Sequence, residues 1–202
     1  DLHSFPTRRS SDLSLEALRG IMDLARGVSV SKHASLATSF GCPFEGAVPL
    51  ERVLSFVARY LDLGITGITL ADTTGMANPR QVAHTVEQFR SRFGDTPLTL
   101  HFHNTRGMGL ANAVAAYEHG AVRFDAALGG LGGCPFAPGA TGNVCTEDLV
   151  HMFEEMQVDT GTDLPALLEL ARRLPALVGH DVPGQVAKAG RTCDLHARPA
   201  GA

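Results

Sequence analysis

Two histidines in a short apolar run have the types and spacing that metal chemistry needs. His101 and His103 are separated by one residue within the sequence LTLHFHN. Because side chains alternate between the two faces of a strand, both imidazoles point to one side, whereas Leu100 and Phe102 point to the other. Paired imidazoles on a rigid strand can bind a metal ion or can be hydrogen-bonded core histidines. The pair by itself leaves both possibilities open.

A glycine-rich segment later in the chain adds a thiol and an amide to this pair. It reads Gly129-Gly-Leu-Gly-Gly-Cys134-Pro and is followed by Gly142-Asn143. Glycine permits backbone conformations that other residues avoid, so the segment could move over a bound substrate. Cys134 lies in this segment, and by itself it could be a small buried residue in a tight turn. This segment and Asn143 favour the metal interpretation of the two histidines.

These segments resemble the 3-hydroxy-3-methylglutaryl-CoA lyases, which belong to a superfamily of metal-dependent lyases and synthases built on a (β/α)8 barrel. The resemblance covers the glycine-rich stretch 129–149, the sequence FGCPFEG at 40–46, the sequence LADTTG at 70–75 and the segment 101–104. It extends from about Ser14 to Arg191. Lyases of the family begin their barrel with a strand ending in Arg-Asp-Gly, and no such triplet occurs in these residues.

The resemblance implies metal-assisted retro-Claisen cleavage of 3-hydroxy-3-methylglutaryl-CoA, or a close 3-hydroxyacyl-CoA, to acetyl-CoA and acetoacetate, as in leucine degradation and ketone body metabolism. It implies that His101, His103 and Asn143 bind a divalent cation. Mg²⁺ or Mn²⁺ suits such mixed imidazole and oxygen ligands. It also assigns His101, Cys134 and Asp72 to catalysis. The implied partners are an acyl-CoA substrate and, for the full-length protein, a second copy in a homodimer.

The neighbouring polar residues have structural explanations as well. Asp72 is expected at the C-terminal end of a strand, where barrel enzymes carry catalytic groups, but it could instead form a turn by accepting from the next two amides. Asn104 alternates away from the histidines, so we expect it to hold the loop or a metal-binding side chain and not the metal itself. Glu147 and Asp148 are expected in the first turn of a helix, where the helix dipole accounts for acidic residues.

Strand and helix patterns alternate along the chain. Strands are predicted near residues 34, 68, 101 and 125, with helices between them, which is typical of a parallel α/β sheet. Helices are predicted from Ser14 to about Gly27, from Pro49, from Asn78-Pro79, from Met108 to His119, from Thr146 and from Asp163 to about Val178, interrupted at Pro175. We therefore expect a partial (β/α)8 barrel, roughly the C-terminal four βα units followed by C-terminal helices.

The organisation predicted from these patterns has three parts. Residues 14–180 form the partial barrel, and residues 181–202 form a weakly ordered tail rich in Gly, Pro, Arg and Ala. Residues 1–13 read like the translation of a sequencing adapter, so we expect them to be non-native. A complete barrel needs about 250 residues, so the 202 residues here predict a fragment. Since four strands cannot close a barrel, a non-catalytic half-barrel with a latent site is one alternative.

Composition narrows the class of protein further. A formal charge of −4 gives no basic surface for nucleic acid, and 44% hydrophobic residues allow a packed core. No apolar run approaches the ~20 residues needed to cross a bilayer. Four widely spaced cysteines, of which Cys42, Cys145 and Cys193 lie outside the proposed site, are expected to be free thiols. These features predict a cytoplasmic protein that binds neither nucleic acid nor membranes.

Two enzyme classes compete with the lyase. A Claisen-type acyl-CoA synthase of the same superfamily would fit the His-x-His-Asn segment, although the Cys134 loop is evidence against it. A metal-dependent amidohydrolase also carries His-x-His on a barrel strand, but it needs further histidines and an aspartate on later strands. Asn143 and the spacing of the remaining histidines favour the lyase.

Overall fold

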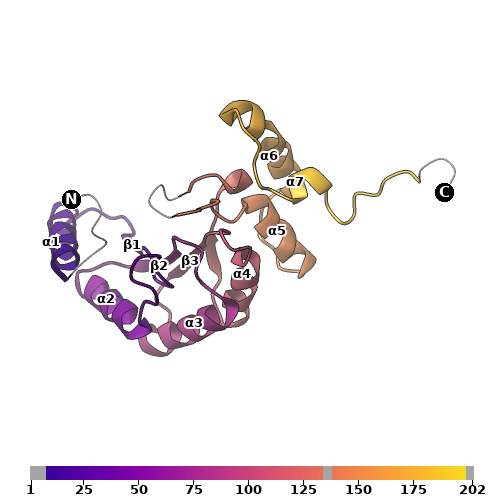
Figure 1. Cartoon of the computed structure of the whole chain (residues 1–202). Helices are drawn as coiled ribbons and strands as arrows, with labels where there is room; N and C mark the ends of the chain where they lie inside the picture. The colour runs from indigo at the N-terminus through magenta and orange to yellow at the C-terminus, as the bar shows by residue number, and fades with distance from the viewer. Residues whose placement is uncertain (1–7, 134–137, 199–202) are drawn as a thin grey trace.

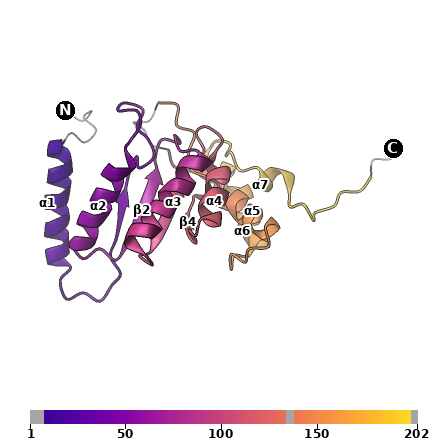
Figure 2. The same ribbon diagram turned by 90° about the horizontal axis from the view of Figure 1, so that it is seen from below.

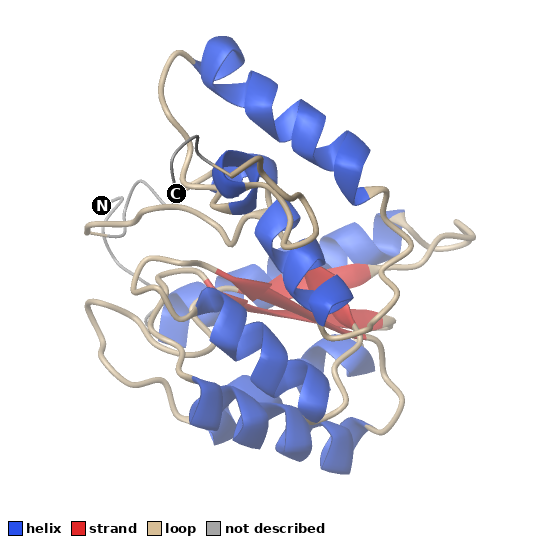
Figure 3. Ribbon diagram, turned by 90° about the vertical axis from the view of Figure 1, so that its right-hand side faces the viewer, coloured by secondary structure: helices blue, strands red, loops and turns tan. Residues whose placement is uncertain are grey.

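A four-stranded parallel sheet forms the centre of the molecule. The structure, a computed structural model, describes residues 8–133 and 138–198. Its strands are β1 (His33–Leu36), β2 (Gly67–Asp72), β3 (Leu98–Phe102) and β4 (Arg123–Asp125), in the spatial order of the chain. All three neighbouring pairs are parallel, and Figure 3 shows the strands as one layer with helices packed against it. The predicted alternation of strands and helices is confirmed, and β1 and β4 are shorter than the sequence pattern indicated.

Helices follow the strands as the sequence signals predicted. They are α1 (Arg8–Leu24), α2 (Leu50–Asp62), α3 (Pro79–Phe93), α4 (Gly109–Glu118), the 3₁₀ helix η1 (Leu128–Gly130), α5 (Thr146–Glu155), α6 (Leu164–Val178) and α7 (Val186–Ala189). Two predicted caps are present: Asn78 Oδ1 accepts from the Gln81 amide at 3.0 Å, and Asp163 Oδ1 accepts from the Ala166 amide at 3.0 Å. Each satisfies one of the unpaired donors at a helix start.

Two helix starts and one predicted interruption differ from the sequence prediction. α1 begins at Arg8, six residues before the predicted start at Ser14. The N-cap of α5 is Cys145, and Thr146 is its first helical residue. α6 runs through Pro175 to Val178 without ending there, and the Gly179 amide donates to the Pro175 carbonyl at 3.0 Å. Pro175 removes one helical hydrogen-bond donor, but it lies within the last four residues of α6, and the helix still reaches Val178.

The main core lies between the sheet and helices α2 to α4. Ile68, Leu70, Leu98 and Leu100 have no exposed surface, because this face of β2 and β3 packs against apolar residues of the helices. The helix residues that share this core include Leu54, Val57, Val82, Val86 and Phe89. Figure 2 shows α1 to α4 side by side in chain order. The helices therefore cover one face of the sheet, which is the layer arrangement of a barrel wall.

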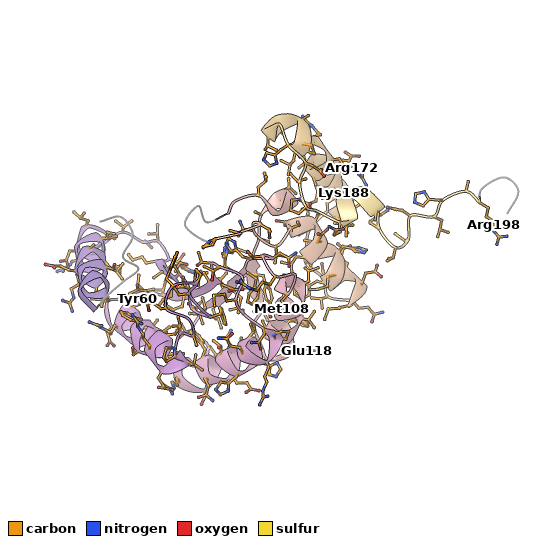
Figure 4. All side chains as sticks on the ribbon, in the orientation of Figure 1. Tyr60, Met108, Glu118, Arg172, Lys188 and Arg198 are labelled. Carbon is orange, nitrogen blue, oxygen red and sulfur yellow. The ribbon has the colours of Figure 1, made fainter. Side chains whose placement is uncertain are left out.

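The C-terminal helices pack at the end of the sheet opposite α1 (Figure 1). Composition predicted a weakly ordered tail over residues 181–202, whereas the structure places α7 against α5 and α6. Asp148 Oδ1 accepts from the amides of Gln185 at 2.9 Å and Val186 at 2.8 Å. Arg172 Nε donates to the Ala187 carbonyl at 3.0 Å, where α6 meets α7 (Figure 4). None of the helices in residues 8–133 and 138–198 combines the length and apolar character needed to span a bilayer.

Candidate metal and catalytic site

The C-terminal end of β3 presents the two histidines on one side. His101 is within the strand and His103 directly follows it, and their ring centroids lie 5.1 Å apart with the planes inclined by 62°. The burial of β3 alternates, with Leu98, Leu100 and Phe102 buried toward the helices. His103 is only 7% exposed. The strand thus fixes both imidazoles beside each other at the edge where parallel barrels carry their chemistry.

A returning segment brings Asn143 to the same place. His103 and Asn143 form an antiparallel bridge. The Asn104 amide donates to the Gly142 carbonyl at 3.0 Å, and the Val144 amide donates to the Phe102 carbonyl at 3.0 Å. Residues directly opposite in an antiparallel pair project their side chains to the same face. Asn143 and His103 are therefore close neighbours, although they are far apart in the sequence.

Glycines make this close approach of two backbone segments possible. Gly142 has φ +111°, and a Cβ there would lie 2.3 Å from the Gly130 carbonyl oxygen. Gly130 has φ +67°, and its Cβ would lie 2.8 Å from Cys145 Sγ. A side chain at either position would force the glycine-rich segment and the segment of Asn143 apart. Cys134 lies outside the described residues.

Asn143 and His103 each have a buried polar atom without a hydrogen-bond partner. Asn143 Nδ2 donates to the carbonyls of Leu131 at 2.7 Å and Gly132 at 3.0 Å, which leaves Oδ1 as the free acceptor. His103 Nδ1 is also buried and unpartnered. Burial, with a smaller contribution from the charge of His101, lowers the pKa of His103 to about 4, so its imidazole is neutral at pH 7. A neutral imidazole and an amide oxygen are both able to bind a cation.

This donor set fits a divalent cation with open coordination positions. Two imidazoles and one amide oxygen meet at the end of β3, and Mg²⁺, Mn²⁺ and related ions accept such mixed ligands. Among residues 8–133 and 138–198, no group of three or more His, Cys, Asp or Glu side chains forms a metal cluster. Any cation here would therefore depend on the Asn143 oxygen and on additional ligands.

A carboxylate that the sequence analysis missed contacts the first histidine. Asp125 of β4 is paired in register with His101, and its Oδ1 contacts His101 Nδ1. The sequence offered one signal, since Asp125 lies near the middle of the predicted strand 122–128, next to the strand that carries the histidines. Only the order of the strands in the sheet, which the structure provides, shows that the two residues are neighbours.

Asp72 ends β2 and is almost completely buried. Its Oδ1 accepts from the amides of Met76 at 2.7 Å and Ala77 at 3.1 Å, three residues beyond the amides that the turn alternative named. Its Oδ2 is buried without a partner. Burial raises the pKa of this carboxyl, and the two amides, Arg106 and His101 partly offset the effect. Asp72 therefore has a structural contact through Oδ1 and a buried Oδ2 without a partner.

The remaining polar residues of the region support the loops. Asn104 Oδ1 accepts from the Gly109 amide at 3.1 Å, which confirms the prediction that it holds the loop. Glu147 has no exposed surface, and its Oε2 accepts from the Gly129 amide at 2.9 Å. Burial raises its pKa. Glu147 thus ties α5 to the start of the glycine-rich segment, a stronger constraint than the helix dipole that the sequence suggested.

The described cysteines Cys42, Cys145 and Cys193 are free thiols, as predicted. Burial and the nearby carboxyl groups of Asp148 and Glu147 raise the pKa of Cys145 to about 12. The thiolate is the reactive form of cysteine, so Cys145 is inert at neutral pH although it adjoins the site.

Comparison with known proteins identifies the family. The HMGL-like family matches residues 7–174, and the chain belongs to this family. It is 45% identical over 183 residues to (R)-citramalyl-CoA lyase of Chloroflexus aurantiacus, covering 91% of this chain and 57% of that protein. It is 41% identical over 177 residues to hydroxymethylglutaryl-CoA lyase YngG of Bacillus subtilis, covering 88% of this chain and 59% of that protein.

A solved structure of the same family confirms the partial barrel. The HMG-CoA lyase of Acinetobacter baumannii, in complex with coenzyme A and 3-methylmalate, matches with 58% identity and a TM-score of 0.89. The match covers 93% of this chain and 61% of that chain. The chain thus spans less than two thirds of the length of these relatives, and its four parallel strands form part of their barrel.

Proposed function

We propose that this chain carries the metal and catalytic residues of an acyl-CoA lyase that cleaves a carbon–carbon bond in 3-hydroxy-3-methylglutaryl-CoA or a close 3-hydroxyacyl-CoA. The observation that supports this most directly is the convergence of His101, His103 and Asn143 at the end of β3, with a partner-free nitrogen and oxygen among them. Family membership supports the reaction class, and it favours a lyase over the amidohydrolase alternative.

The proposed reaction needs one proton removed and one returned. A cation held by His101, His103 and Asn143 would stabilise negative charge on the substrate oxygens as a Lewis acid. Asp72, whose Oδ2 has no partner, takes part in removing the proton of the tertiary hydroxyl. The hydroxyl carbon becomes a carbonyl as the adjacent carbon–carbon bond breaks. The electron pair goes to the thioester α-carbon, which the Cys134 thiol protonates to give acetyl-CoA and acetoacetate.

The acyl group and the direction of the reaction are separate questions. The relatives named above are described as acting on citramalyl-CoA in one case and hydroxymethylglutaryl-CoA in the other. Both names describe lyases, which favours cleavage over the synthase alternative. We place 3-hydroxy-3-methylglutaryl-CoA first and citramalyl-CoA second as substrates. The A. baumannii relative binds coenzyme A, which supports an acyl-CoA substrate.

Two further proposals concern the cellular context. A homodimer of the full-length protein and a cytoplasmic location remain proposals, and the related lyase of Mus musculus is named as mitochondrial. The non-native origin of residues 1–13 is likewise a proposal.

Mn²⁺ binding tests the site in the chain itself. Titration of the 202-residue chain, followed by the electron paramagnetic resonance signal of free Mn²⁺, should show weak binding that His103→Gln and Asn143→Ala each reduce by tenfold or more. His119→Gln is the matched control, because His119 lies at the end of α4 away from β3 and bonds the Ala115 carbonyl. Equal Mn²⁺ binding by the wild type and His103→Gln would rule out the proposed metal site.

Turnover tests the reaction in the full-length protein. Release of acetyl-CoA from 3-hydroxy-3-methylglutaryl-CoA and from citramalyl-CoA should require a divalent cation and should be lost on Cys134→Ala. We expect no turnover from the 202-residue chain alone, because three protein donors leave the cation incompletely held. Turnover by the full-length protein that is unaffected by Cys134→Ala would contradict the proposed proton donor.

A further inference from the structure

The contact between Asp125 and His101 has no part in the mechanism above. We propose that Asp125 is a positioning residue, which holds the His101 ring in the tautomer that carries its proton on Nδ1 and leaves Nε2 as the atom offered to the cation. The proposal rests on the metal site of the proposed function and adds a residue to it.

Strand pairing fixes this contact. The register of the parallel strands β3 and β4 places Asp125 directly beside His101. Asp125 Oδ1 contacts His101 Nδ1, and the side chains of His101 and Asp125 are 27% and 51% exposed. Because both residues belong to strands of one sheet, the ring is held at two points: by its own backbone and by the carboxylate of the adjacent strand.

The chemistry of the two groups determines the tautomer. An ionised carboxylate can only accept a hydrogen bond, so the nitrogen that contacts it must carry the proton. A neutral imidazole has one N–H, and its other nitrogen then has the lone pair that a cation requires. In the described part of the chain, Nδ1 is the His101 nitrogen with a hydrogen bond, and Nε2 has none. Carboxylates bonded to the second nitrogen of a metal-binding histidine have this effect in other proteins.

A second histidine–carboxylate pair in the chain shows the contrast. His119 Nε2 lies 3.4 Å from Glu87 Oε1, and its Nδ1 bonds the Ala115 carbonyl at 2.7 Å. Both nitrogens of His119 thus lie beside protein oxygens. His101 has the same type of carboxylate partner but keeps one nitrogen available. The difference indicates positioning for a ligand at His101 and surface packing at His119.

The residues that follow β4 also hold the segment that carries Asn143. Two residues after Asp125, the Ala127 amide donates to the Val144 carbonyl at 3.2 Å, and the Thr146 amide donates to the Ala127 carbonyl at 2.9 Å. These bonds hold the segment that carries Asn143. The chain that continues from β4 therefore also holds the backbone on the C-terminal side of Asn143.

The tautomer can be measured without metal or substrate. Long-range ¹H–¹⁵N spectra of the ¹⁵N-labelled chain, at a pH where the imidazoles are neutral, report which ring nitrogen carries the proton, and His101→Gln assigns the resonances. We expect His101 to carry it on Nδ1 in the wild type and to shift toward Nε2 in Asp125→Ala. A wild-type His101 protonated on Nε2 would overturn the proposal, and this result needs no variant to fold.

Metal affinity provides the second measurement. Asp125→Ala should weaken Mn²⁺ binding by about 10- to 100-fold, whereas the matched control Glu87→Ala, which removes the carboxylate beside His119, should leave it unchanged. Equal Mn²⁺ affinity of Asp125→Ala and the wild type would contradict the positioning role. If the wild type binds no Mn²⁺ but keeps the Nδ1–H tautomer, the metal site of the proposed function fails while the hold of Asp125 on His101 is supported.

Discussion

The two faces of the sheet differ in what they contribute to the protein. Toward α2, α3 and α4, the side chains of Leu70 and Leu100 are completely buried in a dry core. On the opposite face the same strands carry Thr69, Thr99 and His101, which are half-buried and polar. Because successive side chains of a strand point to opposite faces, alternate residues contribute to the stability of the core or to the polar site. Substitutions on the first face should act on folding, and substitutions on the second should act on binding.

The largest difference between the two faces should appear when the stabilities of Leu100→Ala and Thr99→Ala are compared. Removing the buried leucine side chain should lower the free energy of unfolding by about 2 to 5 kcal/mol, because it leaves a cavity between sheet and helices. Thr99→Ala, one residue earlier on the other face, should cost about 1 kcal/mol or less. Urea denaturation of both variants measures the difference. Equal losses would show that the polar face is as tightly packed as the core.

The pH dependence of the free energy of unfolding tests the burial of His103, a residue of the polar face that is nevertheless buried. Its pKa is about 4 in the folded chain and has an ordinary value of 6.5. Between these values the unfolded chain binds the proton more strongly. Stability from this group is therefore complete above pH 6.5 and is lost as the pH falls toward 4, by about 3 kcal/mol at most.

The contribution of His103 is isolated by comparing wild type with His103→Gln in metal-free urea denaturation from pH 4 to pH 8. The comparison is needed because the raised pKa values of Asp72 and Glu147 act in the opposite direction: their stabilising effect is lost as the pH rises. The gap between the two variants should narrow below pH 6.5. A constant gap would show that His103 is not neutralised by burial.

Substitutions of Asp72 should affect stability less than Leu100→Ala does, and they distinguish the two possible roles of Asp72. Asp72→Ala removes the acceptor for the Met76 and Ala77 amides and should cost about 1 to 3 kcal/mol. Asp72→Asn keeps an acceptor oxygen in place and should change stability by only about 0.5 kcal/mol. In the full-length protein both variants should lose lyase turnover. Normal turnover of Asp72→Asn would leave Asp72 as a loop residue only.

The fold was largely predictable because its signals are local. Helix starts at Asn78 and Asp163 depend on side chains that bond amides of the same turn, so they can be recognised from neighbouring residues. The start of α1 and the passage of α6 through Pro175 were mispredicted, because Ser14 and Pro175 carry local signals for a helix start and a helix break that the chain does not follow.

From residue spacing alone, the site was predictable only where its residues share one strand, and the family resemblance added Asn143. His101 and His103 lie two residues apart, so strand alternation places them together without further information. The Asp125 contact and the buried environment of Glu147 escaped the sequence analysis, because both depend on which segments become neighbours in space. The metal and catalytic roles of the site residues stay predictions.

The sequence by itself determined the alternation of strands and helices, the buried face of each strand and the common side of the two imidazoles, since these follow from periodicities of two and 3.6 residues along one backbone. Only the tertiary structure decided that Asn143 returns beside His103 and that Asp125 reaches His101. The physical reason is that strand pairing and close glycine contacts join segments far apart in the chain, and the free energy of those contacts exists only once the whole sheet has formed.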